Sequence, residues 1–303
     1  MRKFIDLNFN WKFTESFTEE MTKPSFDDSS FEKVDIPHTV KELPYNYFDE
    51  KSYQFISCYR KQFKLPSEAF QNDRRIFINF AGAANYARVF LNGKFVGEHK
   101  DGYTPFRLEI TGYCNKSNNT LAVMIDSTER SDMPPFGNMV DYLCYGGIYR
   151  EVSLEITEKT YIEDVFVKTP EALNPEKTVE ADITFSDSAK GSYTVELLDG
   201  EKCLKNRTAE FEGKVIRARM KVTGVELWDI DSPKLYTLRI SFGSDVFERR
   251  FGFREAKFTR TGFMLNGRKI KLVGLNRHQS YPYVGNAMPA SAQKADADLL
   301  KYR

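Results

Sequence analysis

Residues that could carry out acid–base, nucleophilic or metal chemistry are few in this sequence, and they are widely spaced. Adjacent acidic pairs occur at Glu19-Glu20, Asp27-Asp28 and Asp49-Glu50, in polar stretches where such residues are usually solvated surface. The three histidines are separated by 61 and 179 residues and the four cysteines by 56, 30 and 59 residues, so neither set has the spacing of zinc ligands. Taken alone, these residues indicate no catalytic centre and no metal centre.

The elements that must position any site are predicted to be short β-strands. Apolar and polar residues alternate in runs such as 179–185 and 246–253, which are rich in β-branched and aromatic residues. Asn92-Gly93 and Asn266-Gly267 each separate two such runs and predict type I′ hairpins, because both turn residues need a positive φ. A helix is predicted only near the end, where Ser291 can cap a segment that has one apolar face.

The number of predicted strands is too large for one immunoglobulin-like unit of about 100 residues. We therefore predict a mainly β chain with two β-sandwiches in series. One boundary is predicted near Glu158-Lys159, where a strand-like run gives way to a charged link, and another near Ala256-Lys257. These boundaries give three domains, at residues 1–158, 159–256 and 257–303.

Composition and charge argue against several broad classes of protein. No apolar run approaches the roughly 18–20 residues of a membrane helix, and the first residues lack the apolar stretch of a signal peptide. The net charge is +1, and the nine basic residues of 257–303 alternate with apolar residues instead of clustering. The sparse cysteines suit a reducing compartment. We expect a cytoplasmic protein that binds neither membrane nor nucleic acid.

Short motifs follow one another along the whole chain. The first predicted domain contains Pro37-His38, Tyr59-Arg60-Lys61, Val89-Phe90-Leu91-Asn92-Gly93, Gly102-Tyr103-Thr104-Pro105-Phe106 and Tyr145-Gly146-Gly147-Ile148-Tyr149-Arg150. The second ends at Phe251-Gly252-Phe253-Arg254, and the third contains Gly274-Leu275-Asn276-Arg277-His278. In order and spacing these motifs resemble glycoside hydrolase family 2, whose members include β-galactosidases, β-glucuronidases and β-mannosidases. One departure is Glu151, which stands where the family usually has Asp.

The resemblance implies a fold of three domains and the location of the catalytic residues within it. It implies a jelly-roll sandwich at 1–158, an immunoglobulin-like sandwich at 159–256, and the opening of a truncated (β/α)8 TIM barrel at 257–303, with a first barrel strand at Ile270–Leu275. Retaining glycosidases use one carboxyl group as acid/base and a second as nucleophile, about 5–5.5 Å apart. The family carries both on the middle and later barrel strands. We therefore expect no catalytic carboxylate in this chain, and no activity from it alone.

The same resemblance implies candidates for binding the sugar. Asp141 stands six residues before Gly147, where the family has an acidic residue that reaches into the active site; its oxygens can accept hydrogen bonds from ring hydroxyls. Asn276, Arg277 and His278 follow the predicted first barrel strand, on the face where barrel enzymes place substrates. His278 can donate to a sugar hydroxyl, whereas Arg277 either contacts the sugar or forms a salt bridge beneath it.

The partners and cofactors implied by the resemblance leave alternatives open. The parent protein is predicted to be a β-galactosidase acting on β-linked saccharides, with β-glucuronidase and β-mannosidase open because the specificity residues lie largely in the barrel. A non-catalytic carbohydrate-binding protein is the alternative from another class. Some members of the family use Mg²⁺ or Na⁺ near the site, where Asp141 can supply one oxygen ligand. Homo-oligomers are also expected.

Overall fold

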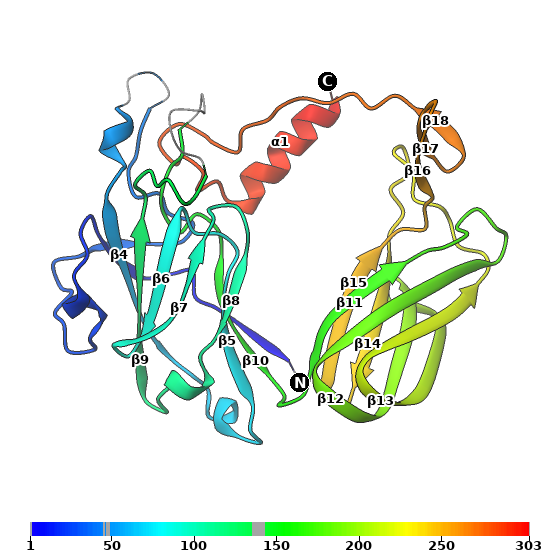
Figure 1. The fold of residues 1–303 in the computed structure, drawn as a ribbon, viewed down its shortest axis with the longest axis horizontal. Helices are drawn as coiled ribbons and strands as arrows, with labels where there is room; N and C mark the ends of the chain where they lie inside the picture. The colour runs from blue at the N-terminus through cyan, green and yellow to red at the C-terminus, as the bar shows by residue number, and fades with distance from the viewer. Residues whose placement is uncertain (1, 45, 47–48, 135–142, 303) are drawn as a thin grey trace. The chain divides into compact units, whose positions relative to one another are not determined.

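A computed structural model describes residues 2–44, 46, 49–134 and 143–302 of the chain. The chain is mainly β, as the alternating sequence predicts (Figure 1). It divides into two units, and each is described by itself. The amino-terminal unit comprises the described residues of 3–156 and 277–303, and the second unit comprises Arg2 with residues 157–276. The domain boundaries expected at residues 158 and 256 remain predictions.

Two sheets form the amino-terminal unit. Neighbouring strands of the six-stranded sheet are antiparallel, in the order β3 (Glu32–Val34), β2 (Trp11–Thr14), β4 (Ile56–Lys64), β9 (Asn118–Asp126), β6 (Tyr86–Leu91) and β7 (Lys94–Lys100). The four-stranded sheet has the order β1 (Lys3–Asp6), β10 (Val152–Thr157), β5 (Arg75–Phe80) and β8 (Phe106–Glu109). Four 3-10 turns connect strands, at Glu19–Thr22, Glu50–Ser52, Ser67–Phe70 and Thr111–Tyr113.

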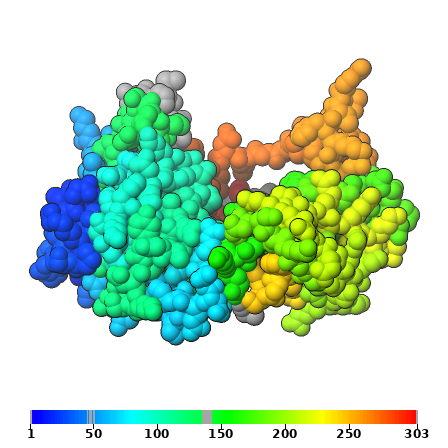
Figure 2. Space-filling view, turned by 60° about the horizontal axis from the view of Figure 1, so that its bottom comes forward, coloured from blue at the N-terminus to red at the C-terminus, as the bar shows by residue number. Residues whose placement is uncertain are grey.

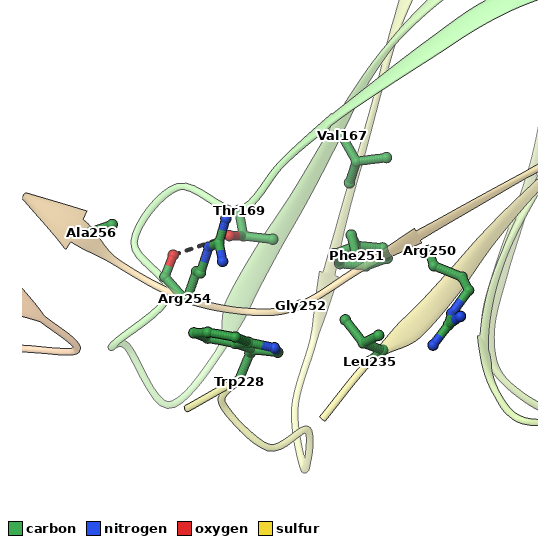
Figure 3. Close-up of a pocket in the computed structure, with 9 residues that line it drawn as sticks. All are labelled: Val167, Thr169, Trp228, Leu235, Arg250, Phe251, Gly252, Arg254 and Ala256. Atoms are coloured by element: carbon green, nitrogen blue, oxygen red, sulfur yellow. Dashed lines mark hydrogen bonds between the residues drawn. The ribbon is translucent and has the colours of Figure 1, made fainter. Parts of the chain in front are cut away.

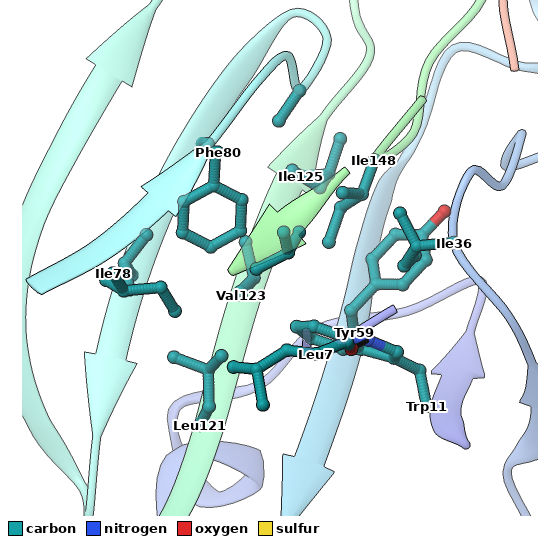
Figure 4. Close-up of a cluster of buried hydrophobic side chains, with 14 of the residues drawn as sticks. Leu7, Trp11, Ile36, Tyr59, Ile78, Phe80, Leu121, Val123, Ile125 and Ile148 are labelled. Atoms are coloured by element: carbon teal, nitrogen blue, oxygen red, sulfur yellow. Dashed lines mark hydrogen bonds between the residues drawn. The ribbon is translucent and has the colours of Figure 1, made fainter. Parts of the chain in front are cut away.

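Residues from both sheets make the core of this unit. Because successive side chains of a strand point to opposite faces, alternate residues of β9 enter the core together. Leu121, Val123 and Ile125 are fully buried there, with Trp11 from β2 and Phe80 from β5 (Figure 4). Burying a large apolar side chain contributes roughly 1.5–3 kcal/mol, so this cluster is the main source of the unit's stability.

Both predicted hairpins are present in the structure. Asn92 and Gly93 have φ values of 54° and 81° and join β6 to β7. Asn266 and Gly267 have φ values of 50° and 77° and join β17 (Gly262–Leu265) to β18 (Arg268–Ile270). Positive φ at both turn positions is the type I′ geometry that the Asn-Gly pairs predicted.

The second unit is built around two long strands. Its five-stranded sheet has the order β11 (Ile162–Lys168), β12 (Lys177–Asp199), β14 (Tyr236–Phe242) and β15 (Asp245–Phe251), and β13 (Lys202–Val222) pairs with β12. The pairing of β12 with β13 shifts register between Thr184 and Ala189, and a β-bulge of this kind bends a strand. The bend lets one hairpin wrap a core that includes Phe185, Leu197 and Leu238.

A three-stranded sheet follows the core of the second unit. It consists of β16 (Ala256–Thr259), β17 and β18 in that order. Every residue of β16 is exposed, and in Figure 2 this sheet, coloured orange, projects from the surface of the unit.

The strand predicted at Ile270–Leu275 does not form in this chain, and that prediction is wrong. Strand β18 ends at Ile270, and residues 271–280 have no regular structure. Leu272, Val273 and Leu275 are 65%, 85% and 79% exposed. A strand needs neighbours to pair its N–H and C=O groups, and no described strand lies beside this segment to do so. The apolar run therefore stays extended.

The predicted carboxy-terminal helix is present as α1 (Ala290–Tyr302). It begins one residue before Ser291, because Pro289 supplies the first accepting carbonyl, to the N–H groups of Ala292 and Gln293. Proline with its fixed φ suits the start of a helix. Ser291 is therefore inside the first turn and is not its cap.

Candidate functional site

The sequence-predicted binding residues fall in different parts of the structure. Asp141 lies outside the described residues. Asn276 is the last residue of the second unit and is exposed, whereas Arg277 and His278 belong to the amino-terminal unit. Neighbouring positions in the sequence bring Arg277 and His278 together, and the imidazole of His278 lies at the surface. A grouping of Asp141 with His278 remains a prediction.

Arg277 forms a salt bridge, which is one of the two roles considered for it. Its Nε donates to Asp296 Oδ2 at 2.8 Å, and its Nη2 donates to the same oxygen. Nη2 also lies 4.0 Å from the sulfur of Met288. Residues 277–303 return to the amino-terminal unit and are called the returning segment. Asp296 is on α1, so the salt bridge of Arg277 links the start of this segment to the helix at its end. Its guanidinium is thereby held in place, and His278 follows it directly.

Arg150 fastens this returning segment to the Tyr145–Arg150 motif. Its Nη1 donates to the carbonyl of Asn286 at 3.1 Å, and its Nη2 donates to Gln279 Oε1. The guanidinium carbon also lies 4.8 Å from the centre of the Tyr149 ring, within cation–π range. Arg150 therefore places Gln279, and with it the adjacent His278, against the end of the β-sandwich.

A turn at residues 281–285 of the returning segment packs beside the contacts of Arg150. Tyr281 and Gly285 exchange backbone hydrogen bonds of 3.1 and 2.9 Å, and Tyr283 N donates to Leu43 O at 2.8 Å. Gly285 has a φ of 54°, and a Cβ built on it would lie 2.5 Å from Tyr145 Cδ1. Only glycine allows this approach, so the turn and the motif are fitted to each other.

The paired glycines of the motif have a similar explanation. Gly147 has a φ of 133°, and a Cβ there would lie 2.3 Å from the carbonyl oxygen of His38. A Cβ on Gly146 would lie 2.0 Å from Ser127 Oγ. Gly147 also exchanges two backbone hydrogen bonds with Ala84, at 2.8 and 3.0 Å. The motif thus packs closely against three other segments at this end of the sandwich.

His38 forms a hydrogen bond with the Tyr145–Arg150 motif. Its backbone N donates to Ile148 O at 2.9 Å, and its Nδ1 lies 2.8 Å from the hydroxyl of Tyr59. Burial lowers the pKa of His38 to about 4, because a charged imidazolium would lose its hydration. The ring is therefore neutral at pH 7, and its role here is hydrogen bonding within the core.

Two polar residues at this end were missed by the sequence reasoning. The Asn85 side chain is largely buried, and its amide makes no hydrogen bond with the described residues, although its backbone carbonyl accepts from Asp101 N at 3.1 Å. The Tyr149 hydroxyl is buried without a hydrogen-bond partner among the described residues, and burial raises its pKa. The sequence feature that could have identified Asn85 is its position as a single Asn within an apolar run. Both groups can serve a ligand or an ordered water.

The polar groups at this end of the amino-terminal unit can form hydrogen bonds. The described residues contain no group of three His, Cys, Asp or Glu side chains placed to hold a metal ion. Among the residues that the structure describes, no helix is long and apolar enough to cross a membrane. The Asn85 amide, the His278 imidazole and the Tyr149 hydroxyl are groups of the kind that form hydrogen bonds with a hydroxylated molecule.

Comparisons with known proteins point in one direction. The profile of "Glycosyl hydrolases family 2, sugar binding domain" matches residues 9–158, and that of "Glycosyl hydrolases family 2" matches residues 160–254. A β-galactosidase of Thermoanaerobacterium thermosulfurigenes is 44% identical over 317 residues, which cover 99% of this chain and 44% of that protein. A β-glucuronidase of Bacteroides fragilis is 30% identical over 325 residues, covering 99% of this chain and 45% of that protein.

A solved structure agrees with these matches. The crystal structure of a Bacteroides uniformis β-glucuronidase has a TM-score of 0.85 and 26% identity, and the match covers 99% of this chain and 38% of that one. The chain thus spans less than half the length of these relatives.

Proposed function

The chain belongs to glycoside hydrolase family 2, and from this we propose that it is the amino-terminal part of a retaining β-galactosidase that releases terminal β-D-galactose. The observation that carries the proposal is the 44% identity to a β-galactosidase across 99% of the chain. In this proposal residues 1–303 bind and orient the sugar, and both catalytic carboxylates lie in residues that this sequence does not include.

The proposed sugar contacts are Asp141, Asn276, Arg277 and His278. His278 donates a hydrogen bond to a ring hydroxyl, and Asp141 accepts from two neighbouring hydroxyls. Asn276 and Arg277 directly precede His278, and Arg277 acts through its salt bridge to Asp296. A charged acceptor roughly doubles the strength of each hydrogen bond that Asp141 receives. In the retaining reaction, these contacts hold the sugar while one carboxylate attacks its anomeric carbon and a carboxylic acid protonates the leaving-group oxygen.

Residues 257–303 are proposed to open the catalytic (β/α)8 barrel. Their exposed apolar side chains support this, since Leu272, Val273, Leu275, Leu299 and Leu300 are all solvent-exposed in the chain as it stands. Contiguous exposed apolar residues normally mark a surface that another part of the protein covers. Neighbouring barrel strands would pair the backbone of 271–275 and bury these side chains.

The experiment compares hydrolysis of chromogenic β-galactoside and β-glucuronide by the full-length protein and by the 303-residue chain. We expect the full-length protein to hydrolyse the β-galactoside faster, and the 303-residue chain to hydrolyse neither. Turnover by the 303-residue chain would show that catalysis does not depend on later residues.

A β-glucuronidase is the second candidate, because several relatives and solved structures that resemble this chain carry that name. The same assay separates β-galactosidase from β-glucuronidase, since faster hydrolysis of the β-glucuronide would identify glucuronate as the sugar.

A third hypothesis, a non-catalytic carbohydrate-binding protein, is favoured by the match of residues 9–158 to a sugar binding domain. Titration calorimetry of the 303-residue chain with a glycan panel tests it, and binding that survives removal of residues 258–303 would support it.

Two further properties belong to the full-length enzyme. We propose that it forms a homo-oligomer, which light scattering of the full-length protein tests. Dependence on Mg²⁺ or Na⁺ is tested by assaying activity after chelation and after exchange of Na⁺ for K⁺.

A further inference from the structure

The second unit carries a pocket of about 400 Å³ beside the end of β15 (Figure 3). Trp228, Leu235 and Phe251 provide its apolar lining, and Arg250 and Arg254 contribute the charged groups. The guanidinium carbon of Arg254 lies 5.0 Å from the centre of the Trp228 ring. The pocket therefore combines an aromatic surface with two positive charges.

Neither arginine is neutralised within the described part of the chain. The side chains of Arg250 and Arg254 make no ion pair and no hydrogen bond there. Three carboxylates at or beside the lining residues have other partners, in the pairs Asp164–Arg249 at 2.8 Å, Asp229–Arg268 at 2.7 Å and Glu255–Lys257 at 2.8 Å. The pocket thus has an unmatched positive charge, which an added carboxylate would complement.

The surface around the pocket is larger than a small ligand needs. A second cavity of about 390 Å³ adjoins it and shares Val167, Arg250 and Phe251. Phe166 lines this second cavity and is largely exposed, and Phe258, two residues beyond the lining residue Ala256, is 84% exposed. Exposed aromatic residues beside arginine are typical of surfaces that bind polypeptide.

We propose that this surface binds an acidic segment of the polypeptide that follows residue 303 in the longer protein. The segment places Asp or Glu carboxylates against Arg250 and Arg254 and an apolar side chain against Trp228 and Phe251. Length identifies the source, because the β-galactosidase that matches 99% of this chain is more than twice as long. The inference rests on the proposed function, which makes residues 1–303 one part of a longer enzyme.

Arginine modification by phenylglyoxal, mapped by mass spectrometry, tests the proposal directly. Arg254 is exposed in the 303-residue chain and should be modified there, and it should lose this reactivity in the full-length protein. Arg207 on β13 is the control: it is exposed, makes no ion pair among the described residues, and should react in both. Equal reactivity of Arg254 in the two proteins would overturn the proposal. Protection that appears only when free glucuronic acid is added would replace it with a small-molecule site.

Charge reversal separates docking from a role in the stability of the unit itself. Arg254→Glu and Arg250→Glu should lower the Tm of the full-length protein more than Arg207→Glu does. In the 303-residue chain the three variants should have equally small effects. Equal shifts in both lengths would assign the arginines to the fold of the second unit. Absence of glycoside hydrolysis by the unmodified full-length protein would count against the proposed function alone, and the arginine protection would still decide the docking.

Discussion

Arg150 connects two segments of the candidate site, since its hydrogen bond to Gln279 joins residues that are 129 positions apart. Arg150→Met keeps an unbranched apolar side chain but leaves Gln279 and the Asn286 carbonyl without their donor. We expect a loss of about 1.5–3 kcal/mol from hydrogen bonds to a charged group, and faster hydrogen exchange in residues 277–288. With His278 in the proposed sugar-binding role, the KM of the full-length protein should rise, because Arg150 no longer holds the adjacent Gln279.

Arg150→Lys is the informative companion to this variant. Lysine keeps the charge but cannot reach both acceptors with a planar fork, so partial recovery of KM is expected. A KM that stays at the wild-type value in Arg150→Met would show that the contacts of Arg150 do not position His278.

Gly147 is a position where no other residue fits. Gly147→Ala places a Cβ 2.3 Å from the His38 carbonyl oxygen at a φ of 133°, so we expect a loss of about 2–4 kcal/mol in the free energy of unfolding. Gly112→Ala is the control, since its Cβ would meet no atom within 4 Å, and its effect should be small. Urea denaturation measures both. Similar effects for the two variants would refute the steric explanation.

His38 makes the stability of the amino-terminal unit depend on pH. The folded state keeps its imidazole neutral until the pKa of about 4, whereas the unfolded chain takes up a proton near pH 6.5. Between these values the unfolded state binds more protons, so the free energy of unfolding falls as the pH drops from 6.5 to 4. The contribution is at most about 3 kcal/mol. Urea denaturation from pH 7.5 to 4 measures it, and His38→Gln should flatten the dependence; an unchanged slope would assign it to other groups.

At the scale of elements, a buried ion pair anchors one end of β15 and the start of β11. Asp245 is fully buried, accepts from Arg2 Nε and Nη2 at 3.2 Å each, and accepts from Ile162 N at 2.8 Å. Asp245→Asn removes the charge that Arg2 requires, and we expect a loss of about 3–5 kcal/mol in the second unit. Asp164→Asn is the control, because its exposed pair with Arg249 should contribute less than about 1 kcal/mol. Thermal denaturation compares them, and equal shifts would contradict the role assigned to burial.

The sequence predicts elements well where the determining chemistry is local. The Asn-Gly hairpins require two residues with positive φ, and the strands require only alternation, so both could be identified without tertiary information. The strand at Ile270–Leu275 could not, because its formation depends on neighbours that this chain does not provide. The same limit applies to the site. The motif residues could be identified in the sequence. The contacts of Arg150, and the lack of a hydrogen-bond partner for the Asn85 amide among the described residues, depend on how distant segments pack together.

At the scale of the whole molecule, each unit has its own hydrophobic core. Units with separate cores unfold as separate cooperative transitions when the contacts between them are weak. We expect two transitions in scanning calorimetry of the 303-residue chain. Gly147→Ala should lower only one of them and Asp245→Asn only the other. A single transition that both variants shift would show that the units unfold as one.

The chain has two tryptophans, and each unit contains one of them. Trp11 is fully buried, whereas Trp228 is partly exposed beneath a guanidinium group. An indole in a dry core emits at shorter wavelength than one in contact with water, and only the latter is readily quenched by acrylamide. The intrinsic fluorescence of the 303-residue chain therefore carries two distinguishable signals, so the opening of either unit can be followed optically without any label.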